Sequence, residues 1–168
     1  TALSLVYPIQ NIVTAVTVGF GIGINALVAF YLGAGQGHLA NRATSLGMLC
    51  NIVHGILLTI FCIGIMPMYL NIFTDNSDIF SQGILYSQIV FSFSIPVSIS
   101  ISFEKIFQAV GRMKVSMICM IIGCVANIIL DPFFIFGVGF FPKLGIKGAA
   151  IATVIGQIAT LLGYIIIY

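Results

Sequence analysis

One carboxylate in this 168-residue sequence lies where a charge is costly. Asp131 follows the uncharged run 115–130 and precedes Pro132 and several phenylalanines, so it lies within an apolar stretch. An ionised Asp at membrane depth costs about 2.5 to 3.5 kcal/mol on insertion scales, so its side chain should face a wet cavity or a partner. Asn127 lies one helical turn earlier on the same face, where its amide can donate to the carboxyl. Such a carboxyl can load and release a proton or hold a sodium ion.

A structural role for Asp131 is the alternative. Pro132 disfavours helical conformation at the residue before it, which predicts a broken helix whose freed N–H groups the carboxylate caps. Position alone does not separate this role from ion binding. The aromatic run that follows would line a cavity or contact lipid; it contains Phe133, Phe134 and Phe136. Glu104, beside Lys105, is expected at a membrane interface.

Glycine-rich segments suggest further sites. Residues 21–26 match the G-x-G-x-x-A dinucleotide fingerprint, but no soluble strand precedes them and no acid occurs about 20 residues on, so a nucleotide cofactor is not supported. Gly19 and Gly23 form a G-x-x-x-G pair in an apolar stretch, which predicts close packing against a neighbouring helix. Residues 33–37, Gly-Ala-Gly-Gln-Gly, could cradle an anion with backbone N–H groups, and a turn explains them better.

Zinc and disulfide chemistry have little support. No C-x-x-C pair occurs, which leaves packing as the simplest role of the cysteines, Cys50, Cys62, Cys119 and Cys124. His54 lies in an apolar stretch, where a helix–helix contact is a simpler interpretation than a proton relay. The sequence implies no cofactor, and the only metal ion that it suggests is sodium at Asp131.

The composition requires a membrane around these residues. Charged residues make up 6% of the chain and hydrophobic residues 60%, with a mean hydropathy of +1.21. That leaves too little polar surface for a soluble protein and too much apolar sequence for a disordered one. The net charge of +2 without a basic cluster makes nucleic acid an unlikely partner.

Five long apolar stretches predict an all-α integral membrane protein, a polytopic bundle of five transmembrane helices. About 20 apolar residues at a rise of ~1.5 Å cross the hydrocarbon core. The predicted spans are 3–32, 46–70, 84–103, 115–136 and 149–168. Residues 92–102 alternate Ser with other types as a barrel strand would, but the rest of the chain does not alternate and Pro96 disfavours a strand. At helical spacing Ser94, Ser98 and Ser102 share one face, where they can bond to a neighbouring helix or line a wet cavity.

The connections between the spans orient the chain. Connections 33–45 and 104–114 share one side and hold four basic residues, whereas 71–83 and 137–148 hold two, so the first pair is predicted to be cytoplasmic. The amino terminus then lies outside and the carboxyl terminus inside. This arrangement is natural if another helix precedes Thr1, so the sequence is interpreted as a fragment.

Four motifs, in order, resemble the multidrug and toxic compound extrusion (MATE) transporters. They are LGAGQGHLANRA (32–43), QAVGRMK (108–114), NIILDPFFIFGVG (127–139) and LGIKGAAIATVIGQ (144–157). The resemblance covers helices two to six of the amino-terminal half, making residues 1–168 a partial amino-terminal lobe. It implies a twelve-helix protein of two bundles with a central cavity that alternates its access. Such a protein exchanges a drug-like, often cationic solute for protons or sodium.

The resemblance also implies roles for individual residues. Asp131 and Asn127 match the fifth-helix acid and amide that some members place in an ion-coupling pocket, and Thr153 resembles a sixth-helix hydroxyl of the same pocket. The first-helix acid of many members has no counterpart here. Ion binding at Asp131 is then expected to alter helix packing around the Asp131–Pro132 break. The implied partners are organic cations, membrane lipid and the remainder of the same chain, in a bacterial plasma membrane.

Two other classes are weaker interpretations. Lipid-linked oligosaccharide flippases share a related architecture, but their cavities are expected to carry basic residues for pyrophosphate, and the spans predicted here have none. An integral-membrane enzyme needs several His, Asp or Glu residues at one face, whereas those of this chain are scattered. The sequence therefore predicts a transporter and not an enzyme.

Overall fold

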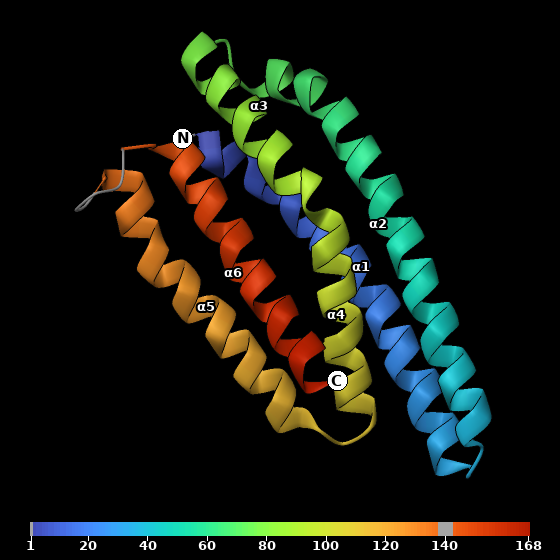
Figure 1. Cartoon of the computed structure of the whole chain (residues 1–168). Coiled ribbons are helices and arrows are strands. Elements are labelled where there is room, and N and C mark those ends of the chain that lie inside the picture. Colours follow the sequence, from blue (N-terminus) through green and yellow to red (C-terminus); the bar gives the residue numbers. More distant parts are fainter. Residues whose placement is uncertain (1, 138–142) are drawn as a thin grey trace.

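The computed structural model describes residues 2–137 and 143–168, which form six helices (Figure 1). Their bounds are α1 Ala2–Gly33, α2 Gly37–Phe73, α3 Ser77–Ser92, α4 Ser94–Ala109, α5 Met113–Phe136 and α6 Ile146–Ile167. No strand occurs within those two ranges, so the all-α prediction is confirmed. By length and apolar composition α1, α2, α5 and α6 can each cross a membrane, and α3 with α4 can form a fifth crossing. Residues 138–142 of the predicted fourth connection lie outside the described ranges.

The third predicted span is bent. α3 ends at Ser92 and α4 begins at Ser94, with the two axes 46° apart. The predicted span 84–103 straddles this bend, because hydropathy records where a chain is apolar and not whether its helix is straight. Pro96 explains the position of the bend. It lies in the first turn of α4, where an N–H is not needed, whereas in a continuous helix its ring would clash with the carbonyl of Ser92.

Several helices extend beyond the predicted spans. α2 contains 37 residues and begins at Gly37, nine residues before the predicted 46–70. Only residues 34–36 separate α1 from α2, and only 110–112 separate α4 from α5. Gly35 and Gly111 adopt φ angles of 70° and 77°, a left-handed conformation that lets the chain reverse within three residues. The turn interpretation of 33–37 is therefore confirmed.

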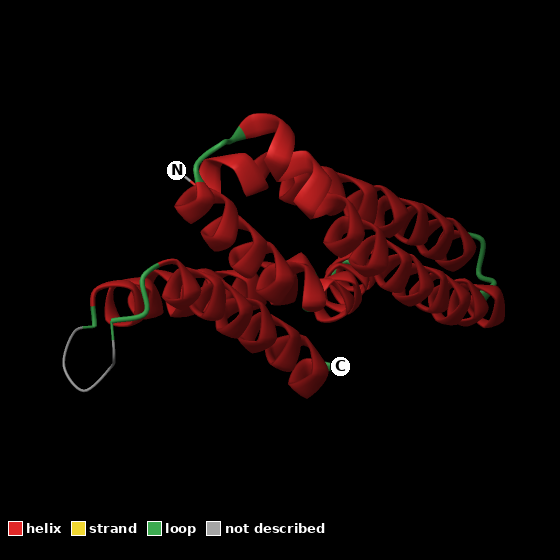
Figure 2. Ribbon diagram, turned by 90° about the horizontal axis from the view of Figure 1, so that it is seen from above, coloured by secondary structure: helices red, strands yellow, loops and turns green. Residues whose placement is uncertain are grey.

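The helices pack as two antiparallel pairs with a bent helix between them. α5 lies along α6, α1 lies along α2, and α3 and α4 separate these pairs (Figures 1 and 2). A buried apolar cluster joins α1, α2, α3 and α6; it includes Val6, Met66, Leu70, Phe91 and Ala150. Many large apolar side chains of α2 and α5 are exposed, as expected for helices that face lipid.

The bundle has two ends, which we name by their turns. The inner end carries the turns 34–36 and 110–112 and residue Tyr168. The outer end carries the turn 74–76 and the beginning of α6. The charge distribution of the connections predicts that the inner end faces the cytoplasm.

The serine face of α4 packs against α2. Ser94, Ser98 and Ser102 are all buried, which confirms that they share a helical face. Asn51 of α2 donates through Nδ2 to the Ser98 carbonyl at 3.0 Å and to Ser102 Oγ at 2.8 Å. A Cβ on Gly55 would lie 2.7 Å from Ser98 Oγ, so the two helices are in close contact. Of the two predicted roles, bonding to a neighbouring helix is therefore the one observed.

Candidate functional site

Asp131 and Asn127 lie on one face of α5, in its outer half. Both side chains are half-buried. Asp131 Oδ1 and Asn127 Nδ2 are each enclosed by protein and have no hydrogen-bond partner among the described residues. Buried polar atoms are normally paired, because leaving one unpaired costs about 1 to 3 kcal/mol. Two unpaired polar atoms one turn apart point to a ligand-binding function.

The capping role predicted for Asp131 is wrong. α5 continues through Pro132 to Phe136, and its carboxyl-terminal cap is Gly137, which has a φ angle of 72°. The carboxylate therefore lies in the helix and does not terminate it. The predicted break at Asp131–Pro132 is also absent, because apolar helices tolerate an internal Pro when neighbouring groups compensate for the lost hydrogen bond. α1 and α2 likewise contain Pro8 and Pro67 inside their helices.

α6 supplies the opposite wall of the site. Thr153 and Asn127 line one cavity of about 240 Å³; its lining residues are Gly123, Cys124, Asn127, Thr153, Gly156, Gln157 and Thr160. Thr153 Oγ1 donates to the Ala149 carbonyl at 2.9 Å, which leaves its lone pairs free to accept. Gln157 lies one turn further along α6, and its Oε1 is buried with no hydrogen-bond partner in the described part of the chain. The structure therefore brings Asn127 and Thr153 to one cavity together with a further amide, Gln157, whereas Asp131 is not among the residues that line it.

Two glycines bring the walls of this cavity together. A Cβ on Gly156 would lie 2.8 Å from the Gly123 carbonyl oxygen and 3.1 Å from Asn127 Cβ. A Cβ on Gly123 would meet the Gly156 carbonyl oxygen at 2.7 Å. Side chains at these positions would force α5 and α6 apart. The close approach of the two backbones therefore sets the distance between Asn127 and the α6 residues opposite it.

Tyr86 of α3 completes the cluster. Its hydroxyl interacts with the Thr153 side chain, and it lies near enough to Asp131 for an electrostatic interaction. Tyr86 was not predicted from the sequence, because a tyrosine in an apolar stretch carries no local sign of its partners. Gln157 was not predicted either, although an amide four residues after Thr153 in an apolar helix was a usable signal. We call Asn127, Asp131, Thr153, Gln157 and Tyr86 the outer cluster.

The outer cluster presents several oxygens and one carboxylate. Within residues 2–137 and 143–168 no Lys, Arg or His forms an ion pair with Asp131. The same ranges contain no group of three His, Cys, Asp or Glu residues that could hold a metal ion. One carboxylate with neutral oxygens, uncompensated at membrane depth, suits a small monovalent cation or a proton better than a divalent metal.

The predicted glycine packing is not made by these helices. A Cβ on Gly19 or Gly23 would meet no atom within 4 Å, and both residues are exposed. The closely packed glycine of this segment is Gly21, where a Cβ would lie 2.8 Å from Lys105 Cγ. Close packing at Gly19 and Gly23 thus remains a prediction about surfaces beyond the described helices.

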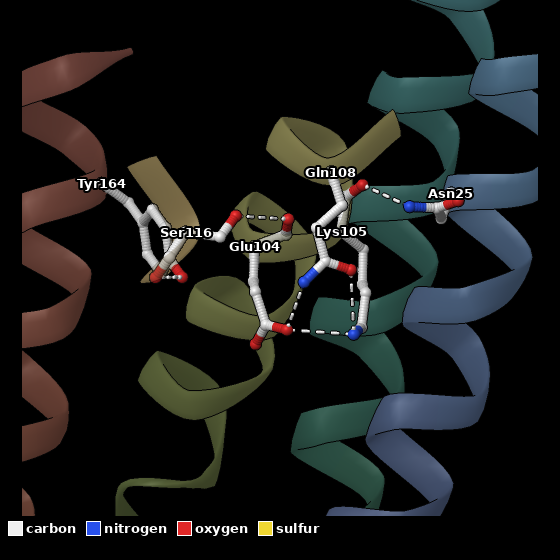
Figure 3. A network of polar contacts seen from close by, with 6 residues as sticks. All are labelled: Asn25, Glu104, Lys105, Gln108, Ser116 and Tyr164. Carbon is white, nitrogen blue, oxygen red and sulfur yellow. Dashed lines mark hydrogen bonds and ion pairs between the residues drawn. The ribbon is translucent and has the colours of Figure 1, made fainter. Parts of the chain in front are cut away.

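The remaining candidates lie away from the outer cluster. The His54 ring lies tilted against Phe20 with ring centroids 4.4 Å apart, a helix–helix contact, and its Nε2 is buried with no partner among the described residues. Phe136 is 68% exposed and does not line the cavity. All four cysteines are free. Glu104 and Lys105 lie inside α4 and form an ion pair (Figure 3).

Comparison with known proteins shows which family this chain resembles. A family model described as MatE matches residues 1–133. The chain is 25% identical, over 99% of its length, to the FAD transporter of Shewanella oneidensis. It is 27% identical, over its whole length, to the multidrug export protein MepA of Staphylococcus aureus. It covers 37% and 36% of these two relatives, so it spans about a third of their length.

Solved structures show the same fold. The chain superposes with a TM-score of 0.91 on an inward-facing multidrug resistance MATE family transporter, at 23% identity, covering 98% of this chain and 36% of that one. A MATE structure in complex with MaD5 gives a TM-score of 0.89, again at 23% identity, with 97% of this chain and 36% of that chain covered. The arrangement of the six helices therefore matches about a third of the length of each of these transporters.

Proposed function

This chain belongs to the MatE family of multi-pass membrane transporters, and we propose that it forms part of the amino-terminal lobe of a secondary active efflux transporter. In this proposal the full-length protein exports a drug-like solute in exchange for protons or sodium ions. The relatives named above are a transporter and an export protein, so the family supports transport and not enzymatic catalysis. No cofactor is needed, because the ion gradient supplies the driving force.

The observation that carries the proposal is the unpaired carboxylate of the outer cluster. Among the residues that the structure describes, Asp131 Oδ1 is buried without a hydrogen-bond partner, and so is Gln157 Oε1 on the facing helix. Rotation of the Asn127 amide about its last bond would turn Oδ1 instead of Nδ2 toward this space. A proton on Asp131, or a sodium ion among these oxygens, would satisfy atoms that the protein alone leaves unpaired.

Coupling would act through the contact of α5 and α6 with α3. We expected movement at a break beside Asp131, but α5 is continuous there. Tyr86 offers another route, since it interacts with Thr153 and lies near Asp131. An ion at Asp131 would change the partners available to Tyr86 and so favour one packing of α3 against the α5–α6 pair. A ligand shifts such an equilibrium only if it binds the two states unequally.

The proposal also concerns the charge of the exported solute. Export of organic cations follows from the family resemblance, and MepA is named for multidrug export. The Shewanella relative is named for FAD, which carries negative charge. A transport assay should therefore include a cationic dye, a neutral drug and FAD. A preference for the dye would support the cationic solute proposed here, and a preference for FAD would contradict it.

The decisive variant is Asp131→Asn in the full-length protein. Reconstituted proteoliposomes would be given a proton gradient or a sodium gradient, and solute flux against each would be measured. We expect the variant to lose gradient-driven flux while its membrane insertion stays normal. Asp75→Asn is the matched control, because Asp75 is an exposed acid of the turn between α2 and α3. Normal flux in Asp131→Asn would contradict the proposed role.

A further inference from the structure

A second polar cluster lies at the inner end of the bundle, on α4 (Figure 3). Lys105 Nζ donates to Glu104 Oε1 at 2.9 Å and to Gln108 Oε1 at 3.2 Å. Gln108 Nε2 donates to Glu104 Oε1 at 2.9 Å, which closes a triangle of side chains. We call Glu104, Lys105 and Gln108 the inner cluster. Its ammonium group is therefore held by one carboxylate oxygen and one amide oxygen.

The inner cluster lies inside the bundle and not at its polar edge. The Lys105 stem packs on Gly21 of α1, and Asn25 Nδ2 donates to the Lys105 carbonyl at 3.0 Å. α1 continues from Asn25 to Gly33, which is about 12 Å further at a rise of ~1.5 Å per residue. Glu104 itself lies five residues before Ala109, the last residue of α4, and its interfacial position stays a prediction. Charged side chains enclosed between membrane-spanning helices are rare and mark binding sites or pathways.

The two faces of α4 differ in access. Ser98, Ser102 and Ile106 are buried. Glu104 and Gln108 lie on the other face, and Lys105, two turns after Ser98, lies at its border. All three are only partly buried, and the Glu104 and Lys105 side chains are both 16% exposed. Figure 3 shows these side chains between α1, which carries Asn25, and α6, which carries Tyr164. The inner cluster is therefore partly accessible, whereas Ser98 and Ser102 are not.

We propose that Glu104 and Gln108 form a binding site for the ammonium group of an exported amine, and that Lys105 occupies this site when no amine is bound. The structure already contains an ammonium group between the two oxygens, so their suitability for that group is observed. Displacement of Lys105 by a charged amine keeps one cation beside Glu104. A neutral analogue would leave the carboxylate unpaired, so the exchange selects for charge. This inference rests on the proposed function, because the solute must enter from the inner end.

The Lys105 side chain can move away from Glu104 and Gln108, whereas the backbone around it is held by hydrogen bonds. Neighbouring residues on a helix do not face each other, so the ion pair with Glu104 requires the Lys105 side chain to bend back. Its four-carbon stem carries a compact, rotatable charge that can swing toward water at the inner end. Ser116 Oγ of α5 donates to the Glu104 carbonyl at 3.1 Å, and Asn25 holds the Lys105 carbonyl from α1. The exchange therefore needs side-chain motion only.

Equilibrium binding to the full-length protein in lipid nanodiscs, with no ion gradient, tests this proposal. The probes are a fluorescent primary alkylamine and its N-acetylated, uncharged counterpart. Lys105→Met removes the internal competitor, and we expect the amine to bind about tenfold more tightly while the amide is unaffected. Glu104→Gln should abolish the preference for amine over amide. Lys114→Met is the matched control, because Lys114 is an exposed lysine in the first turn of α5.

A second variant keeps the proposal testable if Lys105→Met does not fold. Lys105→Arg places a larger, planar cation with more donors against the same oxygens, so it should weaken amine binding and leave the amide unchanged. Unchanged amine affinity in folded Lys105→Met, or in Lys105→Arg, would overturn the proposal and leave the ion pair a structural feature. Asp131→Asn should keep the preference for the amine. Loss of flux in that variant and loss of preference in Glu104→Gln are therefore separate results.

Discussion

Asp131 and Glu104 are carboxylates in apolar helices, but their surroundings differ. Glu104 Oε1 accepts from both Lys105 and Gln108, whereas Asp131 Oδ1 has no partner among the described residues. Ser116 of α5 contacts the inner cluster, so the two carboxylates are separated by about fifteen residues of α5, or about 22 Å along its axis. The inner cluster pairs its own charge, and the outer cluster leaves a charge to be paired by something else.

The two clusters also differ in how they are assembled. The inner cluster consists of residues from one turn of α4, and its geometry follows from that helix alone. The outer cluster draws its side chains from α3, α5 and α6 and depends on how these helices pack. Small movements between helices would therefore alter the outer cluster more than the inner one. This difference agrees with the proposal that the outer cluster binds an ion whose affinity depends on how the helices pack.

The largest effect should come from separating the helices that build the outer cluster. Gly156→Val would place a Cβ 2.8 Å from the Gly123 backbone oxygen, which neither helix can relieve without moving. Overpacking typically costs about 1 to 3 kcal/mol, and a backbone clash lies at the upper end. We expect a large loss of thermal stability in the purified full-length protein and loss of ion-driven flux.

The control for this prediction is a glycine in open space. A Cβ on Gly64 would meet no atom within 4 Å, so Gly64→Val should fold with near-normal stability. If both variants were equally stable, the close approach of α5 and α6 would not be what holds the outer cluster together.

The next largest effect should come from neutralising each carboxylate, which is expected to change the stability of the protein in opposite directions. Glu104→Gln leaves Lys105 without its countercharge in a site only 16% exposed, so we expect a loss of about 2 kcal/mol, between the values for exposed and fully buried pairs. Asp131→Asn removes a charge that has no partner, so stability should stay the same or rise. Thermal melts of both full-length variants measure this difference.

A double variant sharpens the same comparison. Glu104→Gln combined with Lys105→Gln removes both charges, so it should regain most of the stability lost in Glu104→Gln. Equal destabilisation by Glu104→Gln and Asp131→Asn would mean that Asp131 is paired as firmly as Glu104.

The helical fold could be predicted from the sequence because long apolar segments must bond their own backbone groups inside a membrane. Spans of about 20 apolar residues require helices, and the charge-poor windows located them. The break between α3 and α4 at Phe93 was not predicted, since Pro96 could equally have lain within one continuous helix with a slight kink. The continuity of α5 through Pro132 was also missed, because the conformational preference of a residue before Pro is weaker than the need of an apolar helix to keep its backbone bonded.

The candidate site was predictable only along a single helix. Asn127 and Asp131 are four residues apart, so their shared face follows from helical geometry. Thr153 came from a family resemblance, and its presence beside Asn127 in one cavity depends on glycines at positions 123 and 156. Tyr86 reaches the cluster from another helix, and no pattern of spacing encodes that contact. Gly19 and Gly23 fitted a packing motif, yet Gly21 between them makes the observed contact.

A smaller effect is expected from the hydroxyl that links Tyr86 to the outer cluster. Thr153→Ala removes the hydroxyl that interacts with Tyr86, and the loss of this one polar contact should reduce ion-driven flux about tenfold or less without unfolding the protein. Thr153→Ser should retain most of the flux. Thr14→Ala is the matched control, because Thr14 Oγ1 makes the same kind of bond to the Gln10 carbonyl, at 3.0 Å, on an exposed face. Equal flux in Thr153→Ala and Thr14→Ala would remove Tyr86 and Thr153 from the coupling route.

The smallest effect should come from removing the hydroxyl of Tyr164, at the inner end; removal of its whole ring serves as the contrast. Its hydroxyl donates to the Ser116 carbonyl at 3.3 Å, a long bond, while its buried ring stacks against Phe107 with centroids 5.8 Å apart. Tyr164→Phe should therefore cost less than about 1 kcal/mol of stability, because the ring contact remains. Tyr164→Ala should cost about 3 to 5 kcal/mol, since it removes the ring and leaves a cavity. Similar melting temperatures for these two variants would mean that the contact of the Tyr164 ring with Phe107 of α4 adds little stability, and that the hydroxyl bond to Ser116 of α5 accounts for the effect.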